Sequence, residues 1–407
     1  VRAQVVGMGI PLAWLGESGG GRLPDIQGAV GIASLSGEGG NKNSIFPQYS
    51  NIRTTPWVMA VMGQCNGVPV WQACLSDFVV QVKGSTLSVS GVRALQKAIA
   101  ATYTDEDMGG WKVHAEITGM ADRIAEDEED CFRIIREFLD YMPSNNRDLP
   151  PRRDVPKESG KQMDSILTIL PEKRTRSYDM YRIIRTIVDG GTLFDLKPFF
   201  GKTIITCLAR IDGSVVGIIA NQPIINGGAM GIDALEKMTS FLCLCDSFNI
   251  PLLFLHDTPG FITGKDAELR KVGAKVTVAL EALAQVTVPK ISIIIRKTYG
   301  QAMFNMCGPT AGPDFIVAWP TAEIGFLEPE IAADVVYGAL AEEKRKALIE
   351  QMVKEGDPYP LAEQYYIQDI IDPRETRNYL IRVINLIRNS ETKGRGNHLL
   401  ANWPTKF

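Results

Sequence analysis

Two stretches of ten residues, PLAWLGESGG at 11–20 and PLLFLHDTPG at 251–260, align with each other without a gap. Each is a short apolar run that ends in a turn, and Gly20 of the first aligns with Gly260 of the second. Short apolar runs bounded by turn residues are typical of strands buried on both faces, in a sheet covered by helices. The pair therefore predicts an α/β unit that occurs twice in the chain.

A second ungapped match lies downstream of each copy. PWVMAVMGQCNG at 56–67 matches PKISIIIRKTYG at 289–300, and an aspartate followed by phenylalanine comes after both, at 77–78 and 314–315. One match can arise by chance. Two matches in the same order at similar offsets indicate two copies of one fold.

The second copy shows the pattern of the repeating unit. TIITCLARIDGSVVGIIANQ at 203–222 is two strand-like runs around Asp212-Gly213, a hairpin signal. The helical pattern after it has one apolar face, made of Ile232, Leu235, Met238, Phe241, Leu242 and Cys245. The unit is therefore ββα.

A stretch rich in proline and charge separates the two copies and is typical of a linker. We expect a first domain at 1–150, a linker at 151–174 and a second domain at 175–407.

Composition excludes several classes of protein. Of 407 residues, 45% are hydrophobic and 22% charged, and the formal net charge is −4, which gives no electrostatic argument for nucleic acid. No apolar stretch reaches the ~18 residues of a membrane span. Seven scattered cysteines fit a reducing compartment, so we expect the cytoplasm, or the mitochondrial matrix in a eukaryote. Cys243 and Cys245 lie in a helical pattern and are interpreted as buried thiols, with no metal expected.

Four glycine-containing turns carry the expected chemistry. Gly19, Gly20 and Gly21 follow the first strand, and the corresponding turn of the second copy begins at Thr258-Pro259-Gly260. Glycine lets backbone N–H groups approach a ligand closely. The other two turns, at 65–69 and 299–302, open helical patterns whose first N–H groups lack partners and favour a developing negative charge. In the first of these, Pro69 has no N–H, so the donor must be Val68 or Gly67. The sequence has no nucleophile elbow, zinc motif or P-loop, which favours enolate or imidate chemistry.

These residues resemble a known family, the carboxyltransferase (β) subunits of biotin-dependent acyl-CoA carboxylases, such as those of propionyl-CoA and methylcrotonyl-CoA carboxylase. The motifs that carry the resemblance span essentially the whole chain: ESGGGRLPD (17–25), GGWKVHAEITGMAD (109–122), EDCFRIIREFLDYMPSNNRDLPP (129–151), ARIDGSVVGIIANQP (209–223), CDSFNIPLLFLHDTPGF (245–261), VPKISIIIRKTYGQA (288–302) and IIDPRETRNYLIRVINLIR (370–388). Family members carry a further upstream segment, so we expect the acyl-CoA half to lack its first part here.

The resemblance implies two tandem crotonase (ClpP)-like domains, the first binding acyl-CoA and the second carboxybiotin on a separate carrier protein. The implied partners are a biotin carboxylase and a biotin carboxyl carrier subunit. A site would form between the first domain of one subunit and the second of another, within a homohexamer or mixed hexamer. Gly19, Gly20 and Gly21, with the Gly67–Val68 turn, would bind the thioester enolate oxygen, and the N–H groups of Gln301 and Ala302 the biotin ureido oxygen. The expected lining residues are Gly300, Met303, Phe304, Pro259, Gly260 and Phe261.

The chain departs from the family pattern at four places, one of them the tail HLLANWP at 398–404, which replaces a short basic, glycine-containing ending. Gln301 stands where a glycine is common, and Val68-Pro69 stands where relatives show Gly-Ala. Phe304 replaces an acidic residue that lies close to the acyl group in relatives acting on short substrates. These departures imply a changed acyl specificity more than a changed reaction.

Three alternatives remain open. The first is a biotin-dependent decarboxylase or transcarboxylase subunit, which the partner would distinguish. The second is an acyl-CoA hydratase or isomerase, which needs paired carboxylates; Glu17 and Asp257 are candidates, but one falls in each copy. The third is a non-catalytic scaffold paralogue. His256 is also a candidate general base.

Overall fold

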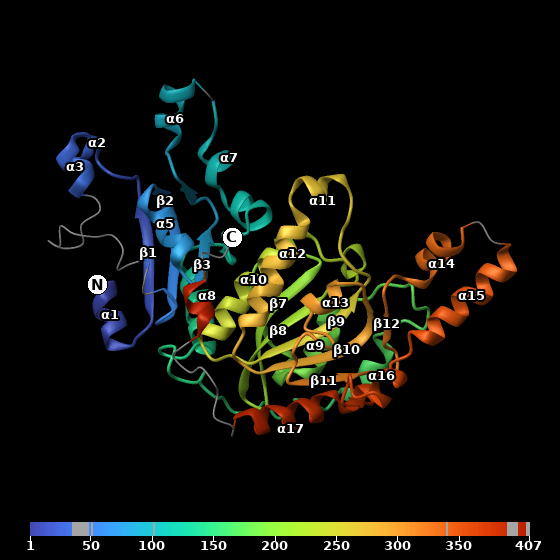
Figure 1. The fold of residues 1–407 in the computed structure, drawn as a ribbon. Helices are drawn as coiled ribbons and strands as arrows, with labels where there is room; N and C mark the ends of the chain where they lie inside the picture. The colour runs from blue at the N-terminus through green and yellow to red at the C-terminus, as the bar shows by residue number, and fades with distance from the viewer. Residues whose placement is uncertain (35–48, 50–51, 101, 339–340, 389–397, 404–407) are drawn as a thin grey trace.

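The computed structural model describes residues 1–34, 49, 52–100, 102–338, 341–388 and 398–403, which form two sheets side by side (Figure 1). The first sheet is parallel, in the order β1-β2-β3-β5, and β4 pairs with the end of β2. The first half of β2 is completely buried, as expected for a strand covered on both faces. The strands are β1 (Leu12–Ser18), β2 (Trp57–Asn66), β3 (Phe78–Val82), β4 (Thr86–Ser88) and β5 (Arg123–Ala125).

The second sheet has eight strands in the order β13-β11-β10-β9-β8-β7-β6, with β12 paired to the end of β10. β6, β7 and β8 are antiparallel neighbours, and the other pairs are parallel. The predicted hairpin is confirmed: β7 and β8 meet at Asp212-Gly213, both with positive φ. The strands are β6 (Leu193–Asp195), β7 (Ile204–Ile211), β8 (Ser214–Asn221), β9 (Leu252–Thr258), β10 (Lys290–Tyr299), β11 (Phe315–Ala318), β12 (Glu323–Gly325) and β13 (Asp369–Ile370).

The repeat seen in the sequence is present in the register of the two sheets. β1 and β2 pair as β9 and β10 do, and both ladders shift register near their carboxyl ends. The shift lies between Gly16 and Ser18 of β1 and between His256 and Thr258 of β9. In each half, the end of the longer strand then pairs with a short strand, β4 or β12. The two halves therefore share their strand pairing as well as their motifs.

The repeated aspartates make the same hydrogen bonds in both halves. The Asp77 Oδ2 atom accepts the Trp57 N–H at 2.8 Å, and the Asp314 Oδ2 atom accepts the Lys290 N–H at 2.8 Å. Each aspartate therefore fixes the start of the longer strand against the start of its neighbour.

Helices cover the sheets and fill the space between them. The predicted apolar helix of the second copy is α10, and its predicted face is buried. The α-helices are α1 (Arg2–Met8), α2 (Leu23–Ile26), α3 (Ala29–Ser34), α5 (Val68–Leu75), α6 (Val92–Ile99), α7 (Asp105–Gly109), α8 (Glu128–Tyr141), α9 (Met180–Ile187), α10 (Ile232–Ser247), α11 (Lys265–Leu269), α12 (Val272–Gln285), α13 (Ala302–Asn305), α14 (Pro329–Tyr337), α15 (Glu342–Glu355), α16 (Tyr359–Glu363) and α17 (Thr376–Arg388). A π-helix spans Val113–Ile117, and short 3-10 helices span Met163–Thr168, Asp189–Gly191, Asn226–Gly228, Pro373–Glu375 and Leu399–Asn402.

One apolar core joins the two halves. Phe78 of β3 stacks on Phe138 of α8 with ring centroids 4.3 Å apart, and Phe194 of β6 lies 5.6 Å from Phe78. The same cluster of buried residues continues into α10 and α12. The two sheets are therefore held by shared side-chain packing.

A second core lies on the opposite face of the second sheet, under α9 and α17. Ile166 and Ile169, from the stretch expected to be a linker, belong to this core. The division at 150 and 175 stays a prediction, and this stretch packs on the second half.

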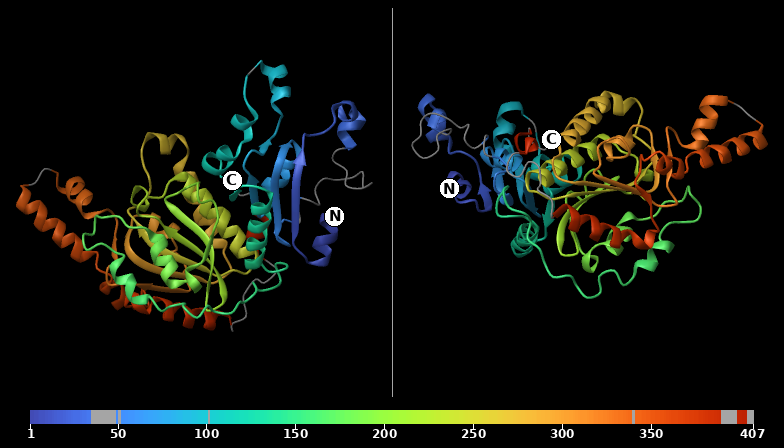
Figure 2. Two further views of the ribbon diagram at one scale, coloured as in Figure 1. Left: turned by 180° about the vertical axis from the view of Figure 1, so that it is seen from behind. Right: turned by 60° about the horizontal axis from the view of Figure 1, so that its bottom comes forward.

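Two pairs of helices project from the body. α6 and α7 rise from the first half, and α14 and α15 extend from the second half on the side away from the first sheet (Figures 1 and 2). Both pairs follow the short strands β4 and β12 that close the repeated unit. Their positions therefore also reflect the repeat.

Candidate functional site

In each half, the turn after the first strand lies against the end of the second strand. A Cβ atom added to Gly20 would lie 3.6 Å from the Asn66 carbonyl oxygen, and one added to Gly260 would lie 3.9 Å from the Tyr299 carbonyl oxygen. Gly20 has a φ of 98° and Gly260 a φ of 127°, a region that disfavours other residues. The structure thus brings the predicted turns together in pairs, one pair in each half.

The first pair offers three unoccupied N–H groups. Within the described residues, the amides of Gly19, Gly21 and Val68 have no hydrogen-bond acceptor. The Gly20 N–H donates to its neighbour Ser18 Oγ at 3.3 Å. These groups are exposed, so an anionic ligand can reach them.

Gly67 is the exception among the predicted donors. Its N–H donates to the Ser88 carbonyl oxygen of β4 at 3.0 Å, so of the two alternative donors predicted for this turn, Gly67 and Val68, the Gly67 amide is already occupied. Gly67 instead supplies a φ of 76° as the residue before α5, which begins at Val68 with Pro69 as its second residue. The Gly67–Val68 turn therefore has one available donor, Val68.

The second pair has two adjacent unoccupied amides. Gly300 has a φ of 60°, and its N–H donates to the Gly325 carbonyl oxygen at 3.0 Å, as Gly67 does to β4 in the first half. Among the described residues, the N–H groups of Gln301 and Ala302 have no acceptor. Gln301 is exposed and Ala302 is fully buried. This turn therefore has two adjacent amides without an acceptor among the described residues.

The predicted lining residues lie on both segments of the second-half pair of turns. Phe304 and Met303 are half-buried in α13, and Met303 covers Gly308, where an added Cβ would lie 2.5 Å from the Met303 Cγ atom. Phe261 pairs with Met230 in an isolated bridge beside the turn. Pro259 lies over the loop at Gly227.

Two cavities flank the second pair of turns. One, of about 360 Å³, is lined by Tyr299, Gly325 and residues of α14 and α15. The other, of about 450 Å³, lies at the start of α10 and is lined by Ile225, Gly231 and Ile262 with the charged Lys202 and Arg270. One cavity thus adjoins the turn that begins at Tyr299, and the other adjoins the turn that ends next to Ile262.

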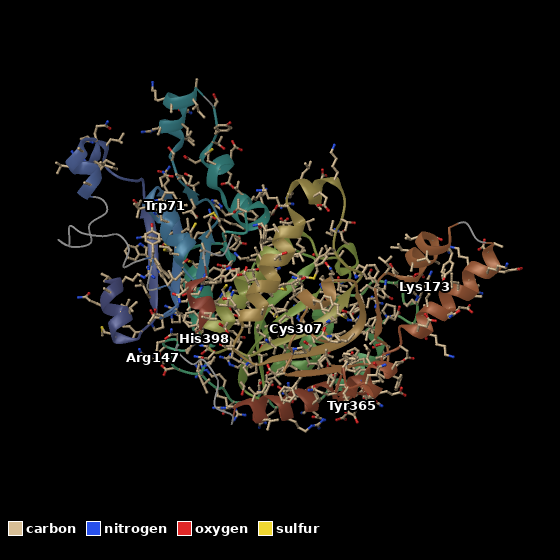
Figure 3. The ribbon with its side chains drawn as sticks, in the orientation of Figure 1. Trp71, Arg147, Lys173, Cys307, Tyr365 and His398 are labelled. Atoms are coloured by element: carbon tan, nitrogen blue, oxygen red, sulfur yellow. The ribbon has the colours of Figure 1, made fainter. Side chains whose placement is uncertain are left out.

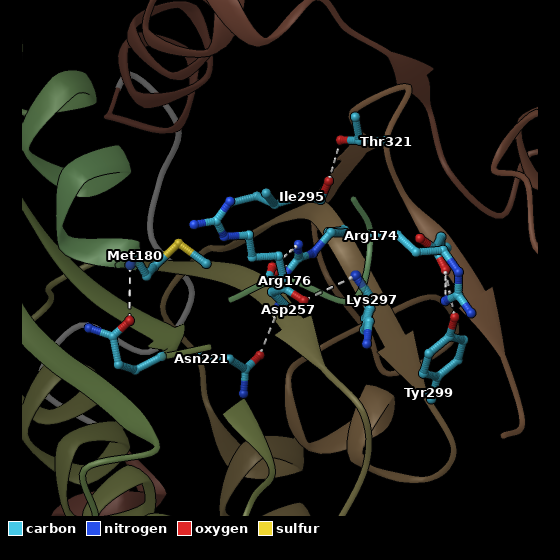
Figure 4. A network of polar contacts seen from close by, with 12 residues as sticks. Arg174, Arg176, Met180, Asn221, Asp257, Ile295, Lys297, Tyr299 and Thr321 are labelled. Atoms are coloured by element: carbon cyan, nitrogen blue, oxygen red, sulfur yellow. Dashed lines mark hydrogen bonds and ion pairs between the residues drawn. The ribbon is translucent and has the colours of Figure 1, made fainter. Parts of the chain in front are cut away.

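Asp257 lies buried directly before the second-half turn, in the polar network that Figure 4 shows. Burial raises the pKa of its carboxyl group, and the nearby Arg296 guanidinium opposes that shift. The Arg296 Nε atom lies 2.9 Å from Asp257 Oδ2. The sequence reasoning missed Arg296; the only available signal was a cation inside the apolar run at 289–300.

Within the described residues, Glu17 and Asp257 do not come together as the carboxylate pair that a hydratase requires. Glu17 is exposed at the end of β1 in the first sheet, and Asp257 is buried at the end of β9 in the second. His256 is fully buried, with its Nδ1 atom 3.4 Å from Thr298 Oγ1, and burial lowers its pKa to about 3. A neutral, enclosed imidazole of this kind is a poor general base for an exposed turn.

The cysteines and acidic residues give no metal cluster in the part of the chain that the structure describes. Cys243 and Cys245 are buried thiols, as predicted, and burial raises the pKa of Cys243 to about 12. Of the helices described, none combines the length and the apolar character needed to cross a bilayer.

The repeated pair of parallel strands, with available backbone amides at the turns in each half, is the arrangement that comparison with known proteins assigns to a class. The carboxyl transferase domain family matches residues 2–398, and the chain belongs to that family. It is a carboxyltransferase, which confirms the resemblance predicted from the motifs. Its neighbours among solved structures are carboxyltransferases of crotonase-like fold, so the predicted fold class is also confirmed.

The relatives include enzymes that add and enzymes that remove a carboxyl group. The methylmalonyl-CoA decarboxylase subunit alpha of Veillonella parvula is 34% identical, over 98% of this chain and 77% of the relative. The mitochondrial propionyl-CoA carboxylase beta chain of Sus scrofa is 34% identical, over 92% of this chain and 68% of the relative. The structure of transcarboxylase 12S, a hexamer solved with methylmalonyl-coenzyme A and methylmalonic acid, matches with a TM-score of 0.88 at 30% identity, covering 96% of this chain and 75% of that one.

Proposed function

We propose that this enzyme transfers a carboxyl group between biotin on a carrier protein and the α-carbon, or a vinylogous γ-carbon, of an acyl-CoA, through an enolate. The observation that carries the proposal is the set of unoccupied amides at the two turns, Val68 with Gly19 and Gly21 in one half and Gln301 with Ala302 in the other. Backbone donors aimed at one oxygen stabilise negative charge that develops there. Both reacting carbonyl groups would need that stabilisation.

Each turn has a separate task in this proposal. The first would stabilise the thioester oxygen as it becomes an enolate oxygen, and the second would stabilise charge on the biotin ureido oxygen. Carboxybiotin, when bound, supplies the CO₂ and the base for the α-proton. The chain then contributes no titrating side chain, in keeping with the exposed Glu17 and the enclosed His256.

The site is proposed to form between two copies of the chain in a hexamer. Apolar side chains are exposed near both turns: Val68 (49%) and Trp71 (46%, labelled in Figure 3) in the first half, and Phe326 (78%), whose backbone adjoins Gly300, in the second. Exposed apolar patches of this kind mark interaction surfaces. A partner copy that covers them would exclude water from the enolate. Transcarboxylase 12S assembles as a hexamer, which supports this arrangement.

A decarboxylase or transcarboxylase is the second candidate. Decarboxylase subunits of Veillonella parvula and Propionigenium modestum are 34% identical to this chain, as similar as the Sus scrofa carboxylase. The same two turns serve either direction, because both directions pass through the same enolate. We propose a biotin carboxylase and a biotin carrier subunit as partners, and the cytoplasm or the mitochondrial matrix as the compartment. The available N–H donors in both halves argue against the third alternative, a non-catalytic scaffold paralogue.

A label-transfer experiment tests the proposal. The chain is mixed with biotin carboxylase, biotinylated carrier, ATP and ¹⁴C-bicarbonate, and acyl-CoAs of increasing chain length are added in turn. We expect acid-stable label in at least one acyl-CoA, and label returned to the carrier from the matching carboxyacyl-CoA. If no thioester gains label and none returns it, the proposed transfer is wrong. Return without gain would favour the decarboxylase.

A further inference from the structure

Asp257 and Arg296 form a buried ion pair under the second-half turns. The Asp257 side chain is 0% exposed and that of Arg296 is 6% exposed, with 2.9 Å between Oδ2 and Nε. The Arg296 guanidinium also donates to the Arg176 carbonyl oxygen at 2.8 Å and lies 4.8 Å from the centre of the Tyr178 ring. Both charges are thus enclosed and partnered.

The pair connects the segments that set the second-half turns. The Asp257 N–H donates to Asn221 Oδ1 of β8 at 3.1 Å, and Asp257 Oδ1 accepts the Lys297 N–H at 3.3 Å (Figure 4). The loop at 226–228 packs against the same residue, because a Cβ on Gly228 would lie 2.5 Å from the Asp257 carbonyl oxygen. Asp257 is therefore a hub between β8, the loop at 226–228 and β10.

Arg296 lies where β10 changes partners. Up to Ile294 the strand pairs with β11, and from Lys297 to Tyr299 it pairs with β12. The register shift against β9 falls in the same interval. Because Gly300 follows directly, the geometry of this shift determines where the Gln301 and Ala302 amides lie.

The first half makes the same shift without an ion pair. The repeat aligns Glu17 with Asp257 and Gly63 with Arg296, and the Glu17 side chain lies over Gly63, where an added Cβ would be 2.7 Å from its Cδ atom. The fold itself therefore does not require the pair. Buried ion pairs are often no more stable than apolar side chains of the same size, so stability alone gives little reason to keep one.

We propose that Asp257 and Arg296 are positioning residues for the Gln301–Ala302 donors. The inference rests on the proposed function of those donors. The pair acts through the backbone and touches no substrate. Its loss lowers turnover on the second-half side and leaves acyl-CoA binding in the first half unchanged.

The test replaces both charges together, so that neither is left buried and unpaired. The Asp257→Leu/Arg296→Met variant is measured for unfolding free energy, for kcat of carboxyl transfer and for KM of acyl-CoA, in the full complex. We expect stability close to that of the wild type, kcat lower by about 100-fold, as for a lost oxyanion donor, and an acyl-CoA KM within twofold. A stable variant with wild-type kcat would overturn the proposal.

A second buried pair provides the matched control. Arg377 of α17 and Asp189 are 6% and 4% exposed, and Asp189 accepts the N–H groups of Asp212 and Gly213 at the β7–β8 hairpin, away from the turns. The Asp189→Leu/Arg377→Met variant is expected to keep wild-type kcat. An equal loss of kcat there would show that any buried pair matters, and would overturn the proposal.

Arg296→Lys decides the case if the double variant does not fold. Lysine keeps the charge but loses the planar fork that donates to Asp257 and Arg176. We expect wild-type thermal stability with kcat about tenfold lower, whereas an unchanged kcat would overturn the proposal. Failure of the proposed function is recognised separately, because the wild type itself would then fail to transfer label. Acyl-CoA binding without biotin is also measured by calorimetry on each variant, and it should stay unchanged if only the second-half donors are displaced.

Discussion

The two halves build the same turn on different supports. Just before the first turn, Gly16 leaves no room for a side chain: an added Cβ would lie 2.4 Å from the Met59 Cε atom, 3.0 Å from the Ala60 carbonyl oxygen and 3.3 Å from the Cys65 Sγ atom. The aligned residue of the second half is His256, a buried imidazole beside Thr298. The backbone of the repeat has thus been kept while the side-chain layer under it has diverged.

The two halves also differ in the number of available N–H donors at these turns. Continuing the alignment past Gly67 and Gly300 places Val68 opposite Gln301 and Pro69 opposite Ala302. Proline has no N–H, so among the described residues this turn has one available donor in the first half and two in the second, while at the other turn Gly19 has an available amide and its aligned residue Pro259 has none. The comparison teaches that the two halves share the strand pairing that leads to their turns, but differ in the amides that those turns offer.

The largest expected effect comes from making the second turn resemble the first. Ala302→Pro removes one of the two donors, and the first half shows that the turn accepts proline at this place. We expect kcat to fall about 100-fold, since one oxyanion donor contributes about that factor. Label transfer from bicarbonate to acyl-CoA measures it.

The control for this variant keeps the amide and changes the side chain only. Ala302→Gly retains the N–H and is expected to stay within a fewfold of the wild type. Full activity of Ala302→Pro, with its fold intact by circular dichroism, would exclude the Ala302 amide as a donor.

A smaller effect is expected at Phe304, which the resemblance to the family predicts to lie near the acyl group. Phe304 is half-buried in α13, two residues after Ala302. Phe304→Asp introduces a carboxylate into a partly apolar position, so we expect the ratio of kcat/KM between long and short acyl-CoAs to shift about tenfold. Phe304→Leu, which stays apolar, should shift it less. An unchanged ranking of acyl-CoAs would remove Phe304 from the pocket wall.

The repeat and its turns could be predicted because short stretches of neighbouring residues determine them. Apolar runs such as 252–255 and glycines such as Gly20 and Gly260 act on their immediate neighbours in the chain. The hairpin at Asp212-Gly213 was predictable for the same reason.

The features that were missed depend on residues distant in sequence. The sequence could not decide between Gly67 and Val68 as donor, because the Gly67 N–H is taken by Ser88 of β4, a strand that pairs beside the end of β2. The partner of Asp257 is Arg296, on another strand. The core at Phe78 and Phe194 joins both halves, which no local pattern indicates.

The smallest effect on rate is expected at His256, where the supports of the two turns differ most. Burial lowers its folded pKa to about 3, against about 6.5 in an unfolded chain. Between these values the unfolded state binds the extra proton, so stability is lost as pH falls below about 6.5. His256→Gln should leave the pH–rate profile unchanged, because a neutral buried imidazole moves no proton in the reaction.

The effect of His256→Gln should instead lie in stability. From pH 6.5 to pH 5 the wild type should lose about 2 kcal/mol of unfolding free energy through this histidine, and the variant should not. Urea unfolding at the two pH values measures the difference. His114→Gln is the comparison, because His114 is also buried but both its ring nitrogens have partners: Nε2 donates to the Leu87 carbonyl oxygen, and Nδ1 contacts Thr118 Oγ1. If the rate profile of His256→Gln moved while its stability did not, the imidazole would belong to the reaction and the contrast between a structural layer and a backbone site would be wrong.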